Sequence, residues 1–302
     1  MIPFAVAPTS VVPYWRDPDT AVHSRFIVVD GIRTHFLEAG AGPTLVLLHA
    51  GDYGSCAEMG WEFNIAALSQ RYRVVAPDWL GYGQTDKLYD FEGGQRRRLA
   101  HMTRVIEALD IDQAAFMGNS MGGTLLAGVA ASPQPIWPIA ALVLASAGGF
   151  APDNEARRNT LDFDCTAAGM KTVLRTVLHD PRWAEDDEYV GRRLKFATSP
   201  GAYEAVAAAR FKSPLVPARS EFGRPDATAY EQIAVPTLLM AGADDRLREP
   251  NYLDALAARI PDNQAIVFDE CGHMPQIEKA KEFNEAVLDF LAAVYPPVQE
   301  LT

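Results

Sequence analysis

The sequence predicts an α/β domain with a mostly parallel central sheet, flanked by helices and interrupted by a helical insertion. Short apolar runs, typical of buried strands, alternate along the chain with segments of helical periodicity. This alternation indicates parallel strands that are joined by crossover helices. It stops near residue 149 and resumes near residue 236. The 302 residues are enough for one large domain that carries such an insertion.

The elements of the first half follow a regular order. Two strand-like segments, 25–29 and 32–38, flank Asp30-Gly31, a strong hairpin turn signal. Continuous apolar runs then predict strands buried on both faces at 44–50, 72–78, 114–118 and 139–146. Helices are predicted between these strands at 61–70, 94–109 and 121–131.

The second half contains the insertion. Residues 149–230 carry charged helical stretches and several prolines, but few strand-like runs. Their apolar content is too thin for an independent core, so we expect them to pack on the main domain as a cap. Strands are predicted again at 236–242 and 264–269, with helices at 252–259 and 278–294. The predicted organisation is a core of residues 1–148 and 231–302 and a helical cap of residues 149–230.

Composition narrows the classes of partner. The formal net charge is -12, which argues against nucleic acids and anionic membranes. Three widely spaced cysteines show neither a disulfide framework nor metal-ligand spacing. The first twenty residues lack the basic region of a signal peptide, and no apolar run reaches the roughly 18 residues that span a bilayer. We therefore expect a cytoplasmic protein that acts on a small molecule.

One short motif predicts a nucleophile. The stretch Gly118-Asn119-Ser120-Met121-Gly122 fits the pattern Gly-x-Ser-x-Gly, with a predicted strand before it and a helix of small residues after it. In this context the serine lies on a strained turn that leaves room only for glycine at the flanking positions. The helix N-terminus favours a developing negative charge, and the N–H of Met121 is a candidate oxyanion donor.

A serine nucleophile needs a base and a carboxylate that orients the base. In this pattern the chain order is serine, then acid, then histidine. Among the six histidines, His273 is the one that follows a late predicted strand outside the cap. The acid is expected after the strand at 236–242, where Asp244 and Asp245 are adjacent. Spacing alone leaves both aspartates open.

The loop after the strand at 44–50 is expected to supply the second oxyanion donor. Its candidates are the backbone N–H groups of Ala50, Gly51 and Asp52, with Gly51 preferred. The carboxylate of Asp52 is unfavourable near an oxyanion unless it points away or pairs with a cation.

These residues together resemble the α/β-hydrolase family, over residues 25–293. Within it the chain looks most like the meta-cleavage-product hydrolases, which cleave a carbon–carbon bond in vinylogous diketones from aromatic-ring degradation. The resemblance is carried by GNSMGG (118–123), APDWLGYGQTDK (76–87), GADDR (242–246) and CGHMPQIEKAKEFNEAVLDFL (271–291). It implies the α/β-hydrolase fold with a Ser120-His273-Asp245 triad, because the second aspartate of the GADDR-like motif is the triad acid in that family. Asp244 is then a structural carboxylate.

The resemblance also implies substrate-binding residues. Arg193, in YVGRRLKFATSPG (189–201), best matches a cap arginine that binds the substrate's carboxylate or dienolate oxygen. Asn119 matches a polar residue of the pocket floor, and Trp183 is a candidate for the pocket wall. The simpler alternatives are a solvated charge for Arg193, a filler of the turn for Asn119 and core packing for Trp183. The family often has tryptophan after the catalytic histidine; this chain has Met274, which predicts a pocket of different shape.

The predicted function is a serine hydrolase of a small carbonyl substrate that uses no cofactor and no metal. Carbon–carbon bond hydrolysis of a diketone or dienol is the first candidate, and a carboxylesterase or lactonase is the alternative. A small-molecule binding protein on the same fold is a third hypothesis, because fold does not fix function. A homodimer stays open.

Overall fold

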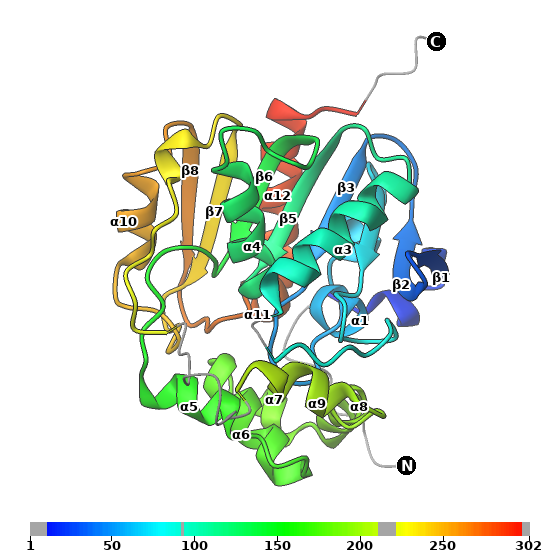
Figure 1. Cartoon of the computed structure of the whole chain (residues 1–302). Coiled ribbons are helices and arrows are strands. Elements are labelled where there is room, and N and C mark those ends of the chain that lie inside the picture. Colours follow the sequence, from blue (N-terminus) through cyan, green and yellow to red (C-terminus); the bar gives the residue numbers. More distant parts are fainter. Residues whose placement is uncertain (1–10, 92–93, 211–221, 298–302) are drawn as a thin grey trace.

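The structure, a computed structural model, describes residues 11–91, 94–210 and 222–297. Its centre is an eight-stranded sheet with the order β1-β2-β4-β3-β5-β6-β7-β8 (Figure 1). The pairs β1–β2 and β2–β4 are antiparallel and all other pairs are parallel. The strands are β1 Val22–Val29, β2 Ile32–Ala39, β3 Thr44–Leu48, β4 Arg73–Pro77, β5 Ala114–Asn119, β6 Ile139–Ala145, β7 Thr237–Gly242 and β8 Asn263–Phe268. The mostly parallel sheet predicted from the sequence is confirmed.

The hairpin prediction is confirmed in detail. Val29 of β1 pairs with Ile32 of β2, so two residues form the turn. Asp30 and Gly31 both have positive φ, at 51° and 79°. Two-residue turns with positive φ at both positions match the twist of the flanking strands, and aspartate and glycine tolerate that conformation best.

Helices cover both faces of the sheet, which explains the continuous apolar runs. All residues of β5 and β7 are buried. One core cluster joins one face of the sheet to side chains of α3, α4 and α10, and a second joins the other face to α1, α2 and α12. In Figure 1, α3 and α4 lie in front of the sheet and α12 behind it. These helices are α1 Ala57–Trp61, α2 Ile65–Leu68, α3 Gln95–Ala108, α4 Met121–Ala130, α10 Tyr252–Ala257 and α12 Ala280–Val294.

One helix prediction was wrong. The segment 61–70 is not one helix: α1 ends at Trp61 and α2 begins at Ile65. Between them the side chain of Asn64 donates to the carbonyl of Gln276, at 3.0 Å, and to Asn284, at 2.8 Å. These contacts fix the chain at a turn. The last predicted helix, 278–294, is confirmed as α12, and a short helix α11, Pro275–Glu278, precedes it.

Helices α5 to α9 lie between β6 and β7 in the sequence and form a group below the sheet in Figure 1. They are α5 Glu155–Leu161, α6 Ala167–Val177, α7 Arg182–Glu185, α8 Asp187–Ala197 and α9 Ala202–Ala207. The described residues also contain short 3-10 helices: η1 Tyr14–Arg16, η2 Ala208–Arg210 and η3 Tyr230–Gln232. A third apolar cluster joins this cap to the core, with Phe163, Met170 and Trp183 packed against Tyr53 and Phe63. The cap limits of 149 and 230 stay predictions, and residues 211–221 of that range lie outside the described residues.

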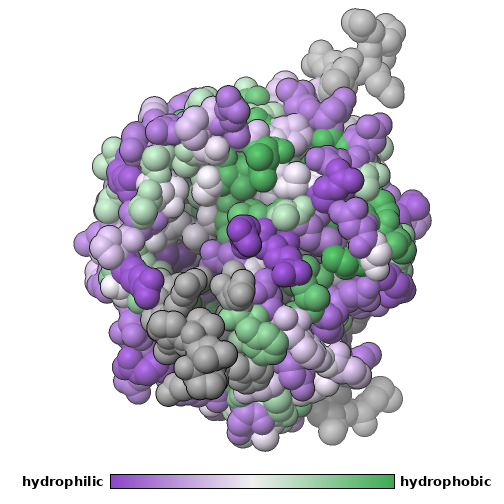
Figure 2. All heavy atoms as spheres, viewed as in Figure 1, coloured by the Kyte–Doolittle hydropathy of each residue, from purple (hydrophilic) through white to green (hydrophobic). Residues whose placement is uncertain are grey.

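The surface in Figure 2 is largely hydrophilic on the face shown, and its hydrophobic residues form small separate groups. Within the described ranges, none of the helices has both the length and the apolar character needed to cross a membrane.

Candidate active site

Ser120 lies on a strained turn between β5 and α4. Its φ of 52° and ψ of -116° are outside the regions that side-chain-bearing residues prefer. The strain is held in place because the N–H of Ser120 donates to the carbonyl of Ala145 in the neighbouring strand β6, at 3.0 Å. Strained backbone of this kind is typical of functional sites. The turn presents Ser120 at the N-terminus of α4, as the motif predicts.

The glycines around Ser120 are required by close backbone contacts. A Cβ atom on Gly118 would lie 2.5 Å from the backbone nitrogen of Gly123. A Cβ atom on Gly122 would lie 2.6 Å from the carbonyl oxygen of His49 and would also collide with the carbonyl of Leu48. Strand β5 and helix α4 therefore leave no space for a side chain at Gly118 or at Gly122.

We expect Gly122→Ala to destabilise the protein by about 1–3 kcal/mol, because the new methyl group meets backbone atoms that have little freedom to move. Gly128→Ala is the matched control on the same helix α4. Apart from its chain neighbours and the backbone of its own helix, no described atom lies within 4 Å of a Cβ at Gly128, so alanine there should stabilise the helix by about 0.5–1 kcal/mol. Urea unfolding of both variants measures the difference, and equal effects would contradict the packing argument.

Three loops bring Ser120, His273 and Asp245 together. Ser120 follows β5, Asp245 follows β7 and His273 follows β8. Nε2 of His273 lies 2.7 Å from Oγ of Ser120, and Nδ1 lies 2.7 Å from Oδ2 of Asp245. The position of His273 is fixed by the cap, because its backbone N–H donates to the carbonyl of Val177 at the end of α6, at 2.8 Å. This is the geometry that lets a histidine accept a serine proton.

Asp245 carries a negative charge in this arrangement. Burial raises its pKa, but His273, the nearby Arg248 and a hydrogen bond from the N–H of Leu247 lower it more, so the net pKa is below the usual value. Its carboxylate therefore accepts the Nδ1–H of His273 and leaves Nε2 free to accept a proton. Asp244 is placed differently: its carboxylate lies 3.0 Å from Nδ1 of His179 in the cap and is half-exposed. The structure brings Asp245, and not Asp244, into contact with His273.

The two predicted oxyanion donors lie against each other. A Cβ on Gly51 would come within 2.9 Å of Cβ of Met121, so the side chain of Met121 packs directly against Gly51. In the described part of the chain, neither N–H makes a hydrogen bond. The hydroxyl of Tyr82 donates to the carbonyl of Gly51, at 2.9 Å, which orients the Gly51–Asp52 peptide that follows. Both N–H groups are therefore free to donate, and their role as an oxyanion hole stays a prediction.

Comparison with known proteins gives the family. Residues 45–286 match the model of the alpha/beta hydrolase family. This chain belongs to the α/β-hydrolase family. It is an enzyme of the hydrolase class, as its relatives are. The chain is 31% identical over 277 residues to a 2-hydroxy-6-oxo-6-(2'-aminophenyl)hexa-2,4-dienoic acid hydrolase of Metapseudomonas resinovorans, an alignment that covers 91% of this chain and 92% of the relative.

Other relatives of this α/β-hydrolase carry related names. A 2-hydroxymuconate semialdehyde hydrolase of Pseudomonas sp. strain CF600 is 32% identical over 272 residues, which are 89% of this chain and 93% of the relative. Among solved structures, a meta-cleavage product hydrolase from Pseudomonas fluorescens IP01 is similar, with a TM-score of 0.79 and 27% identity over 89% of this chain and 97% of that one. The resemblance to meta-cleavage-product hydrolases, found from the sequence motifs, is confirmed.

Asp52 of the hydrolase pairs with a cation, which is one of the two arrangements that its position allows. Its carboxylate forms an ion pair with Arg193 of α8 and accepts a hydrogen bond from the hydroxyl of Ser55. Arg193 is only 1% exposed, and it also lies 3.4 Å from Oγ of Ser55. Burial lowers the pKa of Arg193, but the charge of Asp52 together with contributions from Tyr189 and Cys56 raises it more, so the net pKa is raised. The pair therefore joins the oxyanion loop to the cap.

The other predicted substrate-binding residues, Asn119, Trp183 and Met274, are also buried. Asn119 donates to the carbonyls of Ala145 and His273, at 3.1 and 3.3 Å, and its buried Oδ1 has no partner among the described residues. Trp183 packs against Phe63 of the core. Met274 lies in the same cap–core cluster as Trp183, within 4.0 Å of a nitrogen of Arg193. No contact joins Arg193 or Trp183 to Ser120 in the described chain, and their roles in substrate binding stay predictions.

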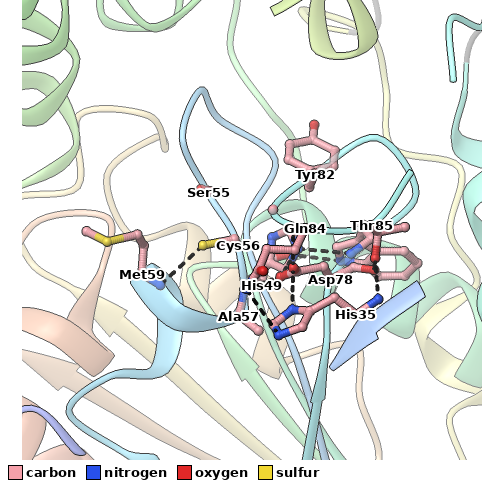
Figure 3. Close-up of polar contacts among 12 residues, drawn as sticks. His35, His49, Ser55, Cys56, Ala57, Met59, Asp78, Tyr82, Gln84 and Thr85 are labelled. Carbon is pink, nitrogen blue, oxygen red and sulfur yellow. Dashed lines mark hydrogen bonds and ion pairs between the residues drawn. The ribbon is translucent and has the colours of Figure 1, made fainter. Parts of the chain in front are cut away.

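The stretch 76–87, which the sequence marks only by resemblance, supports the oxyanion loop (Figure 3). Asp78 is its centre: its carboxylate accepts from Nδ1 of His35 and the N–H of Ala57, both at 2.7 Å, and from the N–H of Gln84, at 2.8 Å. These contacts keep the pKa of Asp78 low although burial raises it. Sequence reasoning missed this network because its members come from four separate segments.

His49 connects the same network to the oxyanion loop (Figure 3). Its Nε2 accepts from the backbone N–H of Trp79, at 3.0 Å, and its Nδ1 donates to the carbonyl of Ala50, at 2.7 Å. Burial lowers the pKa of His49, so the ring is neutral and suits both bonds. The residue before Gly51 is thereby fixed by the loop that contains Asp78.

Arg192, the neighbour of Arg193, binds a buried carboxylate of the core. Its Nη2 lies 2.8 Å from Oε2 of Glu62, which also accepts from Nε1 of Trp15, at 3.1 Å. Glu62 is fully buried, and burial raises its pKa to about 7 against the opposing effect of Arg192. The two adjacent arginines of α8 therefore attach the cap to the core at two carboxylates.

We expect the free energy of unfolding of the hydrolase to fall as the pH rises through the pKa of Glu62. The pKa is about 7 in the folded state and 4.5 without burial, so the folded state binds the proton more tightly. This contribution is complete below pH ~4.5 and is lost as the pH rises through about 7, by at most about 3 kcal/mol. Urea unfolding of the parent and of Glu62→Gln at pH 5 and pH 8 measures it. The difference in the free energy of unfolding between the parent and Glu62→Gln should change from pH 5 to pH 8. Glu285→Gln, on an exposed surface, is the control, and its difference from the parent should be the same at both pH values.

Proposed function

We propose that this hydrolase cleaves a carbon–carbon bond in a diketone, or in its dienol form, by nucleophilic attack of Ser120. The observation that carries the proposal is the continuous hydrogen-bonded line Ser120–His273–Asp245, with both contacts at 2.7 Å. The relatives named as hydrolases of 2-hydroxy-6-oxo dienoates and of 2-hydroxymuconate semialdehyde support the bond and the substrate class.

The geometry supports the following sequence of steps. His273 takes the proton of Ser120 while Asp245 holds the imidazole and stabilises its positive charge. Oγ of Ser120 then adds to the carbonyl carbon, and the N–H groups of Gly51 and Met121 donate hydrogen bonds to the oxyanion that forms. When the carbon–carbon bond breaks, His273 gives its proton to the leaving carbon. Water, activated by the same histidine, releases the acyl group from Ser120 and regenerates the enzyme.

A carboxylesterase or lactonase is the second candidate. It is favoured by the ion pair between Asp52 and Arg193, because an arginine that is already neutralised binds an acidic substrate less well. The steps are the same until the tetrahedral intermediate collapses, when an alkoxide leaves in place of a carbon.

Two substrates in parallel distinguish the candidates. A meta-cleavage dienol is followed by the loss of its visible absorbance, and a short p-nitrophenyl ester by the release of nitrophenol. We expect dienol loss in the parent that disappears in Ser120→Ala and His273→Ala. Ester turnover without dienol turnover, again lost in both variants, would replace the first candidate with the second.

A further inference from the structure

A partly buried carboxylate joins residues 269–274, the histidine loop, to the cap. It belongs to Glu278, the last residue of α11, which follows the histidine loop and lies at the end of the sheet that faces the cap in Figure 1. Oε2 of Glu278 accepts a hydrogen bond from the N–H of Gly272, at 2.7 Å. Oε1 accepts from the N–H groups of His179 and Asp180, at 2.7 and 3.0 Å. The last two residues follow α6 of the cap, so one side chain binds two segments that are far apart in the sequence.

The histidine loop also touches residues 177–180, the cap segment, directly at Gly272. A Cβ atom on Gly272 would lie 2.8 Å from the backbone nitrogen of His179 and 2.8 Å from the carbonyl oxygen of Val177. The same carbonyl accepts the N–H of His273, at 2.8 Å. The two peptide groups that precede the side chain of His273 are therefore both oriented from outside the loop, one by the carboxylate and one by the cap segment.

The chemistry of the side chain suits this arrangement. An ionised carboxylate has an acceptor on each oxygen and no donor, so it can bind N–H groups of both segments at once. A glutamine has the same size, but its amide would turn a donor toward the N–H groups of one of the two segments. Burial raises the pKa of Glu278 above its usual value, although the three backbone N–H groups act against burial. The buried charge is therefore unfavourable by itself, and what it provides is the connection between the two segments.

We propose that Glu278 is a positioning residue for His273: it holds the histidine loop on the cap segment, and the triad is complete only while the cap segment is in place. The inference deepens the proposed function and rests on it in one respect, the role of His273 as the base for Ser120. Glu278 does not touch the reacting atoms and acts on the imidazole through the backbone. Since Nε2 of His273 lies 2.7 Å from Oγ of Ser120, a displacement of about 1 Å is enough to slow proton transfer.

Phosphorylation of Ser120 by diisopropyl fluorophosphate tests the proposal without a dienol. Oγ of Ser120 forms a bond to phosphorus, fluoride leaves and His273 takes the serine proton, so the rate reports the position of the imidazole. Intact-protein mass spectrometry measures this rate in the parent, in Glu278→Gln and in Glu62→Gln. Glu62 is the matched control, because it also binds a cap residue, Arg192, but makes no hydrogen bond with the histidine loop in the described chain.

We expect Glu278→Gln to react about tenfold more slowly than the parent, the usual loss for one hydrogen bond to a charged acceptor. Glu62→Gln should react within about threefold of the parent. Glu278→Asp, a milder change that keeps the charge but shortens the side chain, should slow the reaction in the same direction as Glu278→Gln. Urea unfolding of each variant separates a slower reaction of the folded protein from a loss of folded protein.

Amide hydrogen exchange gives a second measurement that depends on no reaction. Peptides that span residues 177–181 and 271–274 should both exchange faster in Glu278→Gln, because their N–H groups share the acceptor that is lost. A phosphorylation rate of Glu278→Gln within about threefold of the parent would overturn the proposal, since a carboxylate that only stabilises the fold gives that result. Equal slowing in Glu62→Gln would overturn it too, because general loosening of the cap would then be the cause. A parent that is phosphorylated at Ser120 but hydrolyses no dienol counts against the proposed function alone.

Discussion

Asp245→Asn should lower kcat about ten-thousand-fold while the protein stays folded. The carboxylate of Asp245 accepts the Nδ1–H of His273, which leaves Nε2 free to take the proton of Ser120. An asparagine can present its N–H to Nδ1 and so stabilise the opposite tautomer, in which Nε2 carries the proton and cannot act as a base. Steady-state kinetics on the substrate that the parent turns over measure the loss.

Asp244→Asn is the control, because the two aspartates are adjacent and spacing alone does not separate them. The carboxylate of Asp244 contacts His179 of the cap and is half-exposed, so its removal should change kcat less than about threefold. A larger loss in Asp244→Asn than in Asp245→Asn would show that the histidine is oriented by a different carboxylate. Circular dichroism on both variants separates lost chemistry from lost structure.

The fold was predictable where the physical cause is local. Strands such as β5 and β7 are buried on both faces, so a short apolar run identifies each of them. The turn at Asp30-Gly31 follows from two residues that tolerate positive φ. The break between α1 and α2 was not predictable, because Asn64 is held by Gln276 and Asn284, more than 200 residues away in the chain.

The candidate site likewise contains local features that the sequence predicts and long-range contacts that it does not predict. Ser120 and its glycines are recognisable because the strained turn requires a fixed local spacing. The choice of Asp245 needed the family resemblance, and the structure agrees with that choice through the contact with His273. The ion pair of Asp52 with Arg193 spans 141 residues, and the contact of Arg157 with Leu247 spans 90. Such contacts depend on how the cap packs on the core, which leaves no periodicity in the sequence.

Asp52→Ala should lower the free energy of unfolding by about 3–5 kcal/mol, the largest stability loss that we expect from a single polar side chain here. Arg193 is 1% exposed, and Asp52 is its only described ion-pair partner. Without that carboxylate, a buried guanidinium keeps its charge with little water and no counter-charge. Urea unfolding monitored by tryptophan fluorescence measures the loss, and an unchanged slope with denaturant would show that the folded state keeps its compactness.

Two further variants separate the ion pair from the burial of a charge. Glu188→Gln removes the partner of Arg16 at a pair that is about 45% exposed, and should cost less than about 1 kcal/mol. Asp52→Ala/Arg193→Met removes both charges and should recover most of the stability that Asp52→Ala loses, because an apolar side chain needs no counter-charge. If the double variant stays as unstable as Asp52→Ala, packing of the arginine stem, and not its unpaired charge, causes the loss. Recovery of stability without recovery of kcat would instead mean that this ion pair holds the loop of Gly51 in the position that the oxyanion requires.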